Sequence, residues 1–300
     1  MDTTDVSLNE KTVLLNLEFG QVSNRLKVKS DSDSINTEID RKSLHIGVDL
    51  FDAPELRACQ NFLAQLKAKV KTYCSPSFFR GGIYLVKLEA IDTVNEIIKR
   101  AKVDFIPVVR AFADAVEKRR DESQERLKGE YDPDLYPSRE EVIEKFTIEH
   151  CWLSMSTPTS LKKISEDFFQ TEKAKAEESL KSATSEITAL LAAEAKSLGD
   201  HLIERLTPSV DGKPKQIRQS AVANISAFLD TFSFRDIESN ADLKAQMDRV
   251  KTIIAGVDVK DLRMDADLRA DLAKQFTEVT GELDKLVMDR PTRYMEKSNG

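Results

Sequence analysis

The sequence predicts a mainly α-helical, elongated protein with one very long helix and a small β element near the amino terminus. Glycine and proline are scarce, ten and nine in 300 residues, whereas barrels and sandwiches need many tight turns. Residues 159–198 contain neither of them. A helix from about residue 160 to 206 would be about 70 Å long at about 1.5 Å per residue.

The long helix is uneven along its length. Apolar residues recur at both of its ends, but residues 171–179 are almost entirely lysine, glutamate and alanine. Such a segment buries little, so we expect a spacer between two packed regions rather than a continuous coiled coil. Packing of the long helix within the chain and packing on a second copy both stay open, and with them the oligomeric state.

The sequence divides into four consecutive regions: 1–50, a β-hairpin region; 51–157, a helical module with a short strand; 158–206, the long spanning helix; and 207–300, a carboxy-terminal helical bundle. Apolar residues on both sides of Gly20 predict a strand pair with Gly20 at a turn or a bulge. Asp52 and Pro54 predict a helix start, and Pro107 predicts a kink or a split in the second helix.

Further local signals mark loops, caps and a strand. Residues 74–83 are expected to form a loop and residues 121–137 a charged linker. Ser138 with Glu141 predicts a capping box, and alternation in residues 148–153 predicts a short strand that could pair with the amino-terminal hairpin. Helix starts are expected at Asn240 and Asp265, and a helix end at Gly256.

Composition excludes several classes of protein. No apolar run approaches the roughly 20 residues that span a bilayer, and the polar, acidic amino terminus is unlike a signal peptide, so we expect a cytoplasmic protein. The net charge of −7 disfavours a general nucleic-acid coat. Local basic patches remain, and they are either solvated helix ends or a nucleic-acid interface. Their residues are Lys118, Arg119, Arg120, Lys213, Lys215 and Arg218.

Motifs for catalysis are missing from the sequence. It contains no phosphate loop, no dinucleotide fingerprint and no nucleophile elbow. His150 and Cys151 are adjacent on an expected strand, so they point to opposite faces and cannot share a proton. His201 and Glu204 have a metal-ligand spacing but lack the further ligands of a di-iron bundle. We therefore predict no enzyme, no catalytic residue, no cofactor and no metal.

One turn differs from the surrounding helical pattern, because two of the ten glycines stand together there after two aromatic residues and an arginine. Such a sequence predicts a tight turn with unusual backbone angles. It is either a packed turn between helices or a loop that binds a partner. The residues of the turn are Phe78, Phe79, Arg80, Gly81, Gly82 and Tyr84.

The same turn, with the helix before it and the strand at residues 13–19, resembles a family of phage and prophage proteins known only as a domain of unknown function. The resemblance covers about residues 11–255. Family members share a phenylalanine-glycine-glycine-tyrosine turn followed by a long helical body, and here Arg80 interrupts the turn. Genes of this family often lie near those of MoxR-like AAA+ ATPases and cobaltochelatase-like subunits. The resemblance therefore implies a helical adaptor or substrate of such a machine.

These observations together predict a non-enzymatic scaffold or adaptor that acts through protein–protein contacts, with a AAA+ ATPase as a possible partner. A homo-oligomer is compatible with the long amphipathic helix. The alternative is a nucleic-acid-binding phage protein that uses the basic patches. No membrane partner is expected.

Overall fold

The computed structural model describes residues 8–28, 46–75, 82–209, 214–237 and 239–288. The described chain is mainly α-helical with a small three-stranded sheet, as the sequence predicts. It forms two compact units. Unit 1 comprises Met1–Asn16, Lys71–Asp92 and Trp152–Gly300, and unit 2 comprises Leu17–Val70 and Thr93–Cys151. Both units are assembled from separated segments, whereas the four regions expected from the sequence are consecutive.

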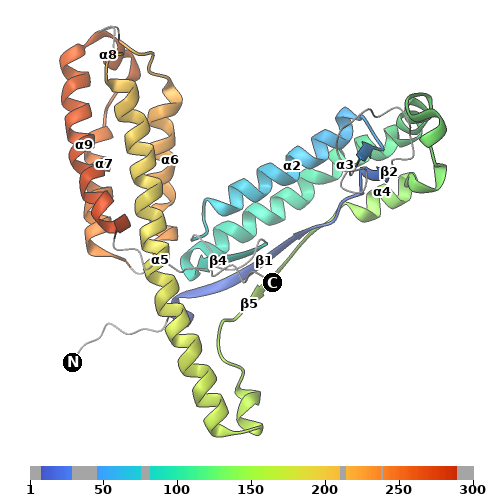
Figure 1. The fold of residues 1–300 in the computed structure, drawn as a ribbon, viewed down its shortest axis with the longest axis horizontal. Helices are drawn as coiled ribbons and strands as arrows, with labels where there is room; N and C mark the ends of the chain where they lie inside the picture. The colour runs from blue at the N-terminus through green and yellow to red at the C-terminus, as the bar shows by residue number, and fades with distance from the viewer. Residues whose placement is uncertain (1–7, 29–45, 76–81, 210–213, 238, 289–300) are drawn as a thin grey trace, which may run out of the picture. The chain divides into compact units, whose positions relative to one another are not determined.

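The carboxy-terminal part of unit 1 is a four-helix bundle, as predicted (Figure 1). Its helices are α5 (Glu166–Leu206), α6 (Gln219–Arg235), α7 (Ala241–Ile254) and α9 (Ala266–Met288), and the short α8 (Val259–Met264) connects the last two. Apolar stripes at spacings of three and four residues bury one face of each helix in a common core.

Helix caps in the bundle follow the sequence signals. The side chain of Asn240 accepts a hydrogen bond from the Leu243 amide at 2.9 Å, which caps α7. Asp265 accepts from the Leu268 amide at 2.9 Å and starts α9 in the same way. After α7, Gly256 has a φ of 76°, the left-handed conformation that glycine adopts without strain. These caps confirm the expected boundaries.

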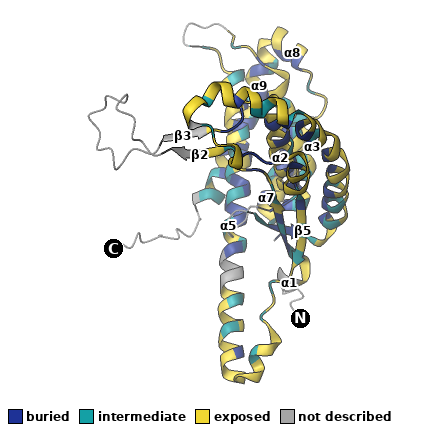
Figure 2. Cartoon of the chain, turned by 90° about the vertical axis from the view of Figure 1, so that its right-hand side faces the viewer, coloured by how far each residue is buried: buried dark blue, intermediate teal, exposed yellow. Residues whose placement is uncertain are grey.

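The long helix begins later than expected. Residues Thr159–Lys163 form a 3₁₀ turn, and α5 starts at Glu166 because the Ser165 side chain accepts a hydrogen bond from the Phe168 amide at 3.4 Å. Its 41 residues span about 60 Å. Residues 171–178 are exposed or half-buried, which confirms the predicted uneven burial (Figure 2). The apolar residues at this end were expected to pack against another part of the protein. That expectation is wrong for Phe168, which is exposed.

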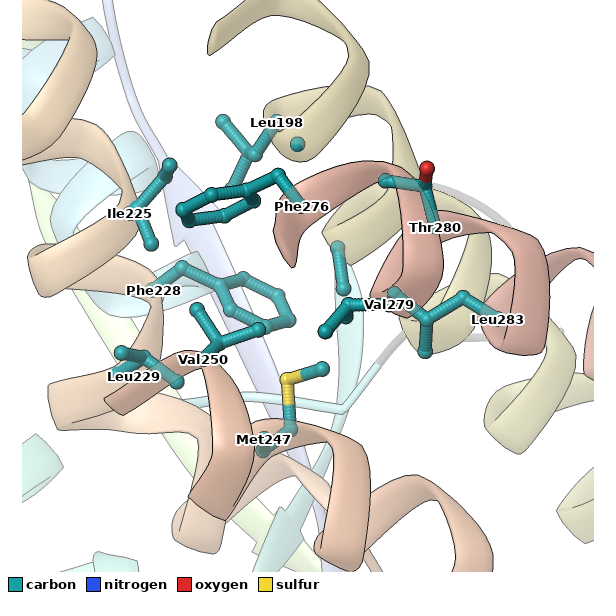
Figure 3. A pocket seen from close by; sticks show the side chains of 12 residues that line it. Leu198, Ile225, Phe228, Leu229, Met247, Val250, Phe276, Val279, Thr280 and Leu283 are labelled. Carbon is teal, nitrogen blue, oxygen red and sulfur yellow. The ribbon is translucent and has the colours of Figure 1, made fainter. Parts of the chain in front are cut away.

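At Gly199, α5 lies close against side chains of α9. A Cβ atom at this position would lie 2.6 Å from Thr280 Cγ2 and 3.5 Å from Phe276 Cδ1. The surrounding side chains, shown in Figure 3, enclose a void of about 10 Å³, which is at the limit for a single water molecule. This region is therefore a packed core rather than a ligand site.

The strand pairing differs from the expected hairpin. β1 (Thr12–Phe19) pairs antiparallel with β4 (Ile83–Lys87), placing Leu14 opposite Leu85, and the sheet order is β4-β1-β5 with β5 (Ile148–Leu153). A loop was expected at residues 74–83 and a helix with Leu88 as its first apolar residue, so β4 was not predicted. The expected pairing of residues 148–153 with the amino-terminal strand is confirmed.

A second sheet pairs β2 (Arg25–Val28) with β3 (Ile46–Asp49). The predicted turn between β1 and β2 at Gly20 is therefore wrong. The Gly20 amide donates to the Thr147 carbonyl at 3.0 Å, and a Cβ at Gly20 would lie 2.4 Å from the Lys145 carbonyl oxygen. Glycine is needed there because two backbone segments meet closely.

Unit 2 is organised around two long helices that lie side by side, α2 (Pro54–Lys71) and α3 (Ile91–Leu127) (Figure 1). The Phe62 and Phe105 rings stack across them with centroids 4.9 Å apart. Pro107 does not split α3, which runs on into the segment that was expected to be a charged linker. The cap expected from Asp52 is wrong, because the Arg57 amide bonds to the Ala53 carbonyl and makes Ala53 the cap.

The close approach at Gly199 gives the first prediction. Gly199→Ala should lower the free energy of unfolding by about 1–2 kcal/mol, because overpacking against buried Thr280 outweighs the gain in helix propensity. Gly281→Ala on α9 is the matched control, since nothing lies within 4 Å of its added methyl. It should stabilise the protein by up to about 1 kcal/mol. Urea unfolding of both variants measures the difference, and equal effects would contradict this account of α5–α9 packing.

Candidate functional site

A cavity of about 410 Å³ opens between α3 and α4 (Arg139–Lys145) in unit 2, and we name it the α3–α4 groove. Its volume falls in the range of ligand-binding clefts. The lining residues come from α3, from α4 and its end, and from the start of β5: Lys102, Phe105, Ile106, Val109, Arg110, Ile143, Phe146 and Ile148.

Helical spacing places the α3 side chains of the groove on one face. Lys102, Ile106 and Arg110 follow each other at intervals of four residues, so they form one ridge. On the other side, Ser138 and Glu141 form a reciprocal capping box that sets the start of α4. The sequence pattern predicts this box, which determines where Ile143 stands on α4.

The floor of the groove is buried and its rim is exposed. Phe105 and Phe146 meet edge to face with centroids 6.0 Å apart, and both are buried. At the rim, Ile106 is 49% exposed and Ile143 is 39% exposed. Large aliphatic side chains on both sides of an open cleft leave an apolar surface that water covers in the isolated chain.

The charge in the groove is positive and uncompensated. The carboxylates near Lys102 and Arg110 on α3 are engaged by other cations: Asp104 lies 3.5 Å from Arg100, and Asp114 lies 2.8 Å from Arg139. Within the described residues, Lys102 and Arg110 form no ion pair, and no carboxylate lines the groove. The arrangement favours an anionic occupant.

His150 lies on β5, two residues after Ile148 of the groove. It is half-buried, and its Nδ1 atom is buried with no hydrogen-bond partner in the part of the chain that the structure describes. Burial and the nearby Lys102 charge lower the pKa of His150, which keeps the ring neutral at neutral pH. Its neighbour Cys151 is exposed.

The glycine turn singled out by the sequence lies largely outside the described residues, since residues 76–81 are not described. Those include Phe78, Phe79, Arg80 and Gly81. Gly82 has a φ of 97°, a backbone angle that favours glycine. Tyr84 is buried on β4, and burial raises its pKa.

The predicted basic residues divide between the two units, and several are neutralised. Arg119 donates two hydrogen bonds to Glu55, at 2.7 and 3.0 Å, and a third to Glu122 at 2.8 Å. Lys118 lies 3.9 Å from the same Glu122.

The second part of the patch follows α5 in unit 1. Lys215 lies 3.7 Å from Glu204, and Arg218 is exposed just before α6. Lys213 lies outside the described residues. Arg120 is half-buried, and it belongs to unit 2 together with Lys118 and Arg119.

Groups that could support catalysis are not gathered in the described residues. No three His, Cys, Asp or Glu side chains among them converge as a metal site, and His201 is exposed. Burial raises the pKa of Cys59 to about 11 and that of Cys74 to about 12, which disfavours the reactive thiolate. None of the described helices combines the length and apolar character that crossing a bilayer requires.

The sequence analysis missed the groove, although one signal for it was present. The core stripe of α3 includes Ile98, Phe105 and Val109. Ile106 and Val103 fall outside this stripe and are exposed. Apolar residues beyond a complete stripe indicate a second apolar face, and Ile106 of that face lines one wall of the groove.

The ion pair of Arg119 gives a prediction about pH. Glu55→Gln should lower the free energy of unfolding by about 1 kcal/mol at neutral pH, because Arg119 loses a mostly buried charged partner. The hydrogen bonds from Arg119 hold the pKa of Glu55 below its ordinary value. The stabilisation is therefore fully present above the ordinary pKa of a glutamate and is lost as pH falls through the lowered pKa.

Urea unfolding of the full chain at neutral pH and at about pH 3 tests this, and the difference between wild type and variant should shrink at the lower pH. Glu117→Gln is the control, since Glu117 is exposed on α3, the helix that carries Arg119. A difference that is independent of pH would contradict the assignment.

Comparison with protein-family models, with curated proteins and with solved structures finds no match to this chain. The resemblance to the phage and prophage family stays a prediction.

Proposed function

We propose that this protein is a non-enzymatic scaffold or adaptor that acts through protein–protein contacts, and that the α3–α4 groove binds a segment of its partner. The proposal rests on one observation. The groove combines an open apolar cleft with two cations, Lys102 and Arg110, that no carboxylate neutralises within the described residues. Exposed apolar surface next to unpaired charge is typical of an interaction site.

The groove chemistry favours an amphipathic, acidic helix as occupant. Apolar anchors of such a helix would fill the cleft between Ile106 and Ile143, in the way that helices bind apolar grooves in other proteins. Lys102 and Arg110 stand eight residues apart on α3, which is about 12 Å. Carboxylates two turns apart on a partner helix match that spacing.

A binding assay with a synthetic helical peptide tests the proposal. The probe carries three leucines on one face and aspartates two turns apart beside them, and its control carries lysines in place of the aspartates. Fluorescence anisotropy with the full chain should show binding of the acidic peptide only.

Two matched variants on α3 test whether the peptide binds in the groove. Ile106→Asp should weaken binding of the acidic peptide at least about tenfold, or about 1.4 kcal/mol. Val103→Asp should leave it unchanged, because Val103 is 63% exposed and lies outside the groove lining. Equal binding by wild type and Ile106→Asp, or a preference for the lysine peptide, would contradict the proposal.

The identity of the partner is a further part of the proposal. The family resemblance supports a MoxR-like AAA+ ATPase in a phage or prophage setting. Purification from the native host should recover such an ATPase with wild type and less of it with Ile106→Asp. Recovery of the chain alone would count against an adaptor role.

The alternative, nucleic-acid binding through the basic patch, has weaker support because Arg119 is held by two glutamates. It predicts salt-sensitive retention on DNA. The absence of retention at low salt would remove it.

A further inference from the structure

A second exposed apolar surface lies at the amino-terminal end of α5, and we name it the α5 tip: Leu161, Ile164, Glu166, Asp167 and Phe168. Ile164 is 73% exposed and Phe168 is 44% exposed. Their neighbour Phe169 is buried, with Lys162 Nζ 4.6 Å from its ring centroid. The chain therefore buries Phe169 and leaves Ile164 and Phe168 in water. Figure 2 shows that this end of α5 is mostly exposed.

The local capping of α5 does not bury the side chain of Ile164. This residue precedes the cap Ser165, where an apolar side chain commonly packs on the fourth helical residue, here Phe169. An exposed fraction of 73% shows that Ile164 does not make this contact to any large extent. The side chain remains available to another surface.

The first turn of α5 places two carboxylates beside the exposed apolar side chains of the α5 tip, after Lys162 and Lys163. Asp167 forms no ion pair within the described part of the chain, and Glu166 accepts a hydrogen bond from Gln170 at 2.8 Å and pairs with exposed Lys162 at 3.6 Å. Exposed pairs of this kind contribute little and exchange readily. The tip thus presents apolar side chains beside two carboxylates, while the groove presents apolar walls beside Lys102 and Arg110.

We propose that the α5 tip of one copy of this chain docks in the α3–α4 groove of a second copy. The inference rests on the proposed function, because it takes the groove to be a binding site and names its occupant. Tip and groove are different surfaces, so the contact is heterologous. Each copy then offers a free groove and a free tip, and assembly proceeds head to tail.

Sedimentation velocity of the full chain tests this proposal. The average mass should rise with concentration and exceed that of a dimer at concentrations on the order of 100 μM, since small interfaces bind weakly. The tip variant, Ile164→Ser with Phe168→Ser, and the groove variant, Ile106→Asp, should each remain monomeric. Val103→Asp should assemble like the wild type.

Mixing the two defective variants gives the sharpest result. The groove variant keeps an intact tip, and the tip variant keeps an intact groove, so one productive contact is possible. The mixture should form a one-to-one dimer and nothing larger. A charge exchange provides a second route: Lys102→Glu with Arg110→Glu should abolish assembly, and adding a chain with Glu166→Lys and Asp167→Lys should restore it.

The other outcomes separate this inference from the proposed function. A wild-type chain that stays monomeric while its groove binds the acidic probe peptide would overturn the inference and leave the proposed function standing. Assembly that persists in both variants would place the interface elsewhere and overturn the inference. A groove that binds neither the probe nor a second copy would overturn both.

Discussion

The packing of α9 along α5 is the contact on which the rest of unit 1 depends. Gly199 lets the two helices approach closely enough for Phe276 and Leu202 to be fully buried, and α6 and α7 then complete the bundle. The bundle end of α5 also supplies a helical nucleus for the other end. Helix formation is limited by nucleation, so a segment attached to a fixed helix extends it at low cost.

This nucleation explains how α5 continues through a segment that buries little. Residues 171–178 are held by local ion pairs, such as Lys173 with Glu177 at 3.7 Å and Lys175 with Glu172 at 2.7 Å. Each exposed pair contributes only a few tenths of a kcal/mol. The segment is helical because it continues the bundle helix, and it presents the α5 tip at its end.

Local signals in the sequence predicted most helices and caps, and they failed where the outcome depends on distant residues. Asn240, Asp265 and the Ser138–Glu141 box act through backbone amides within a few residues, so their effect is visible in the sequence. One partner of β1, the strand β4, lies about 70 residues away, and alternation alone did not identify it. Ile164 and Phe168 show the same limit: periodicity predicts an apolar face but not what covers it.

The charged residues show why composition alone could not locate the site. Arg119 belongs to the most basic run of α3, yet its three hydrogen bonds to glutamates leave it little capacity to attract an anion. Lys102 and Arg110 are separated in sequence, and their neighbouring carboxylates bind other cations. Recognition therefore depends on which charges remain unpaired after folding, and only the structure reveals them.

The sizes of these contributions determine what kind of contact the groove can make. Burial of Ile164 and Phe168 would contribute about 1.5–3 kcal/mol each, and each exposed ion pair at most about 1 kcal/mol. Association costs at least about 4 kcal/mol in lost freedom of motion. The net free energy of association is therefore small, and such a contact forms and dissociates readily. A reversible contact of this strength suits an adaptor, because a partner segment with more apolar anchors would displace the α5 tip from the groove.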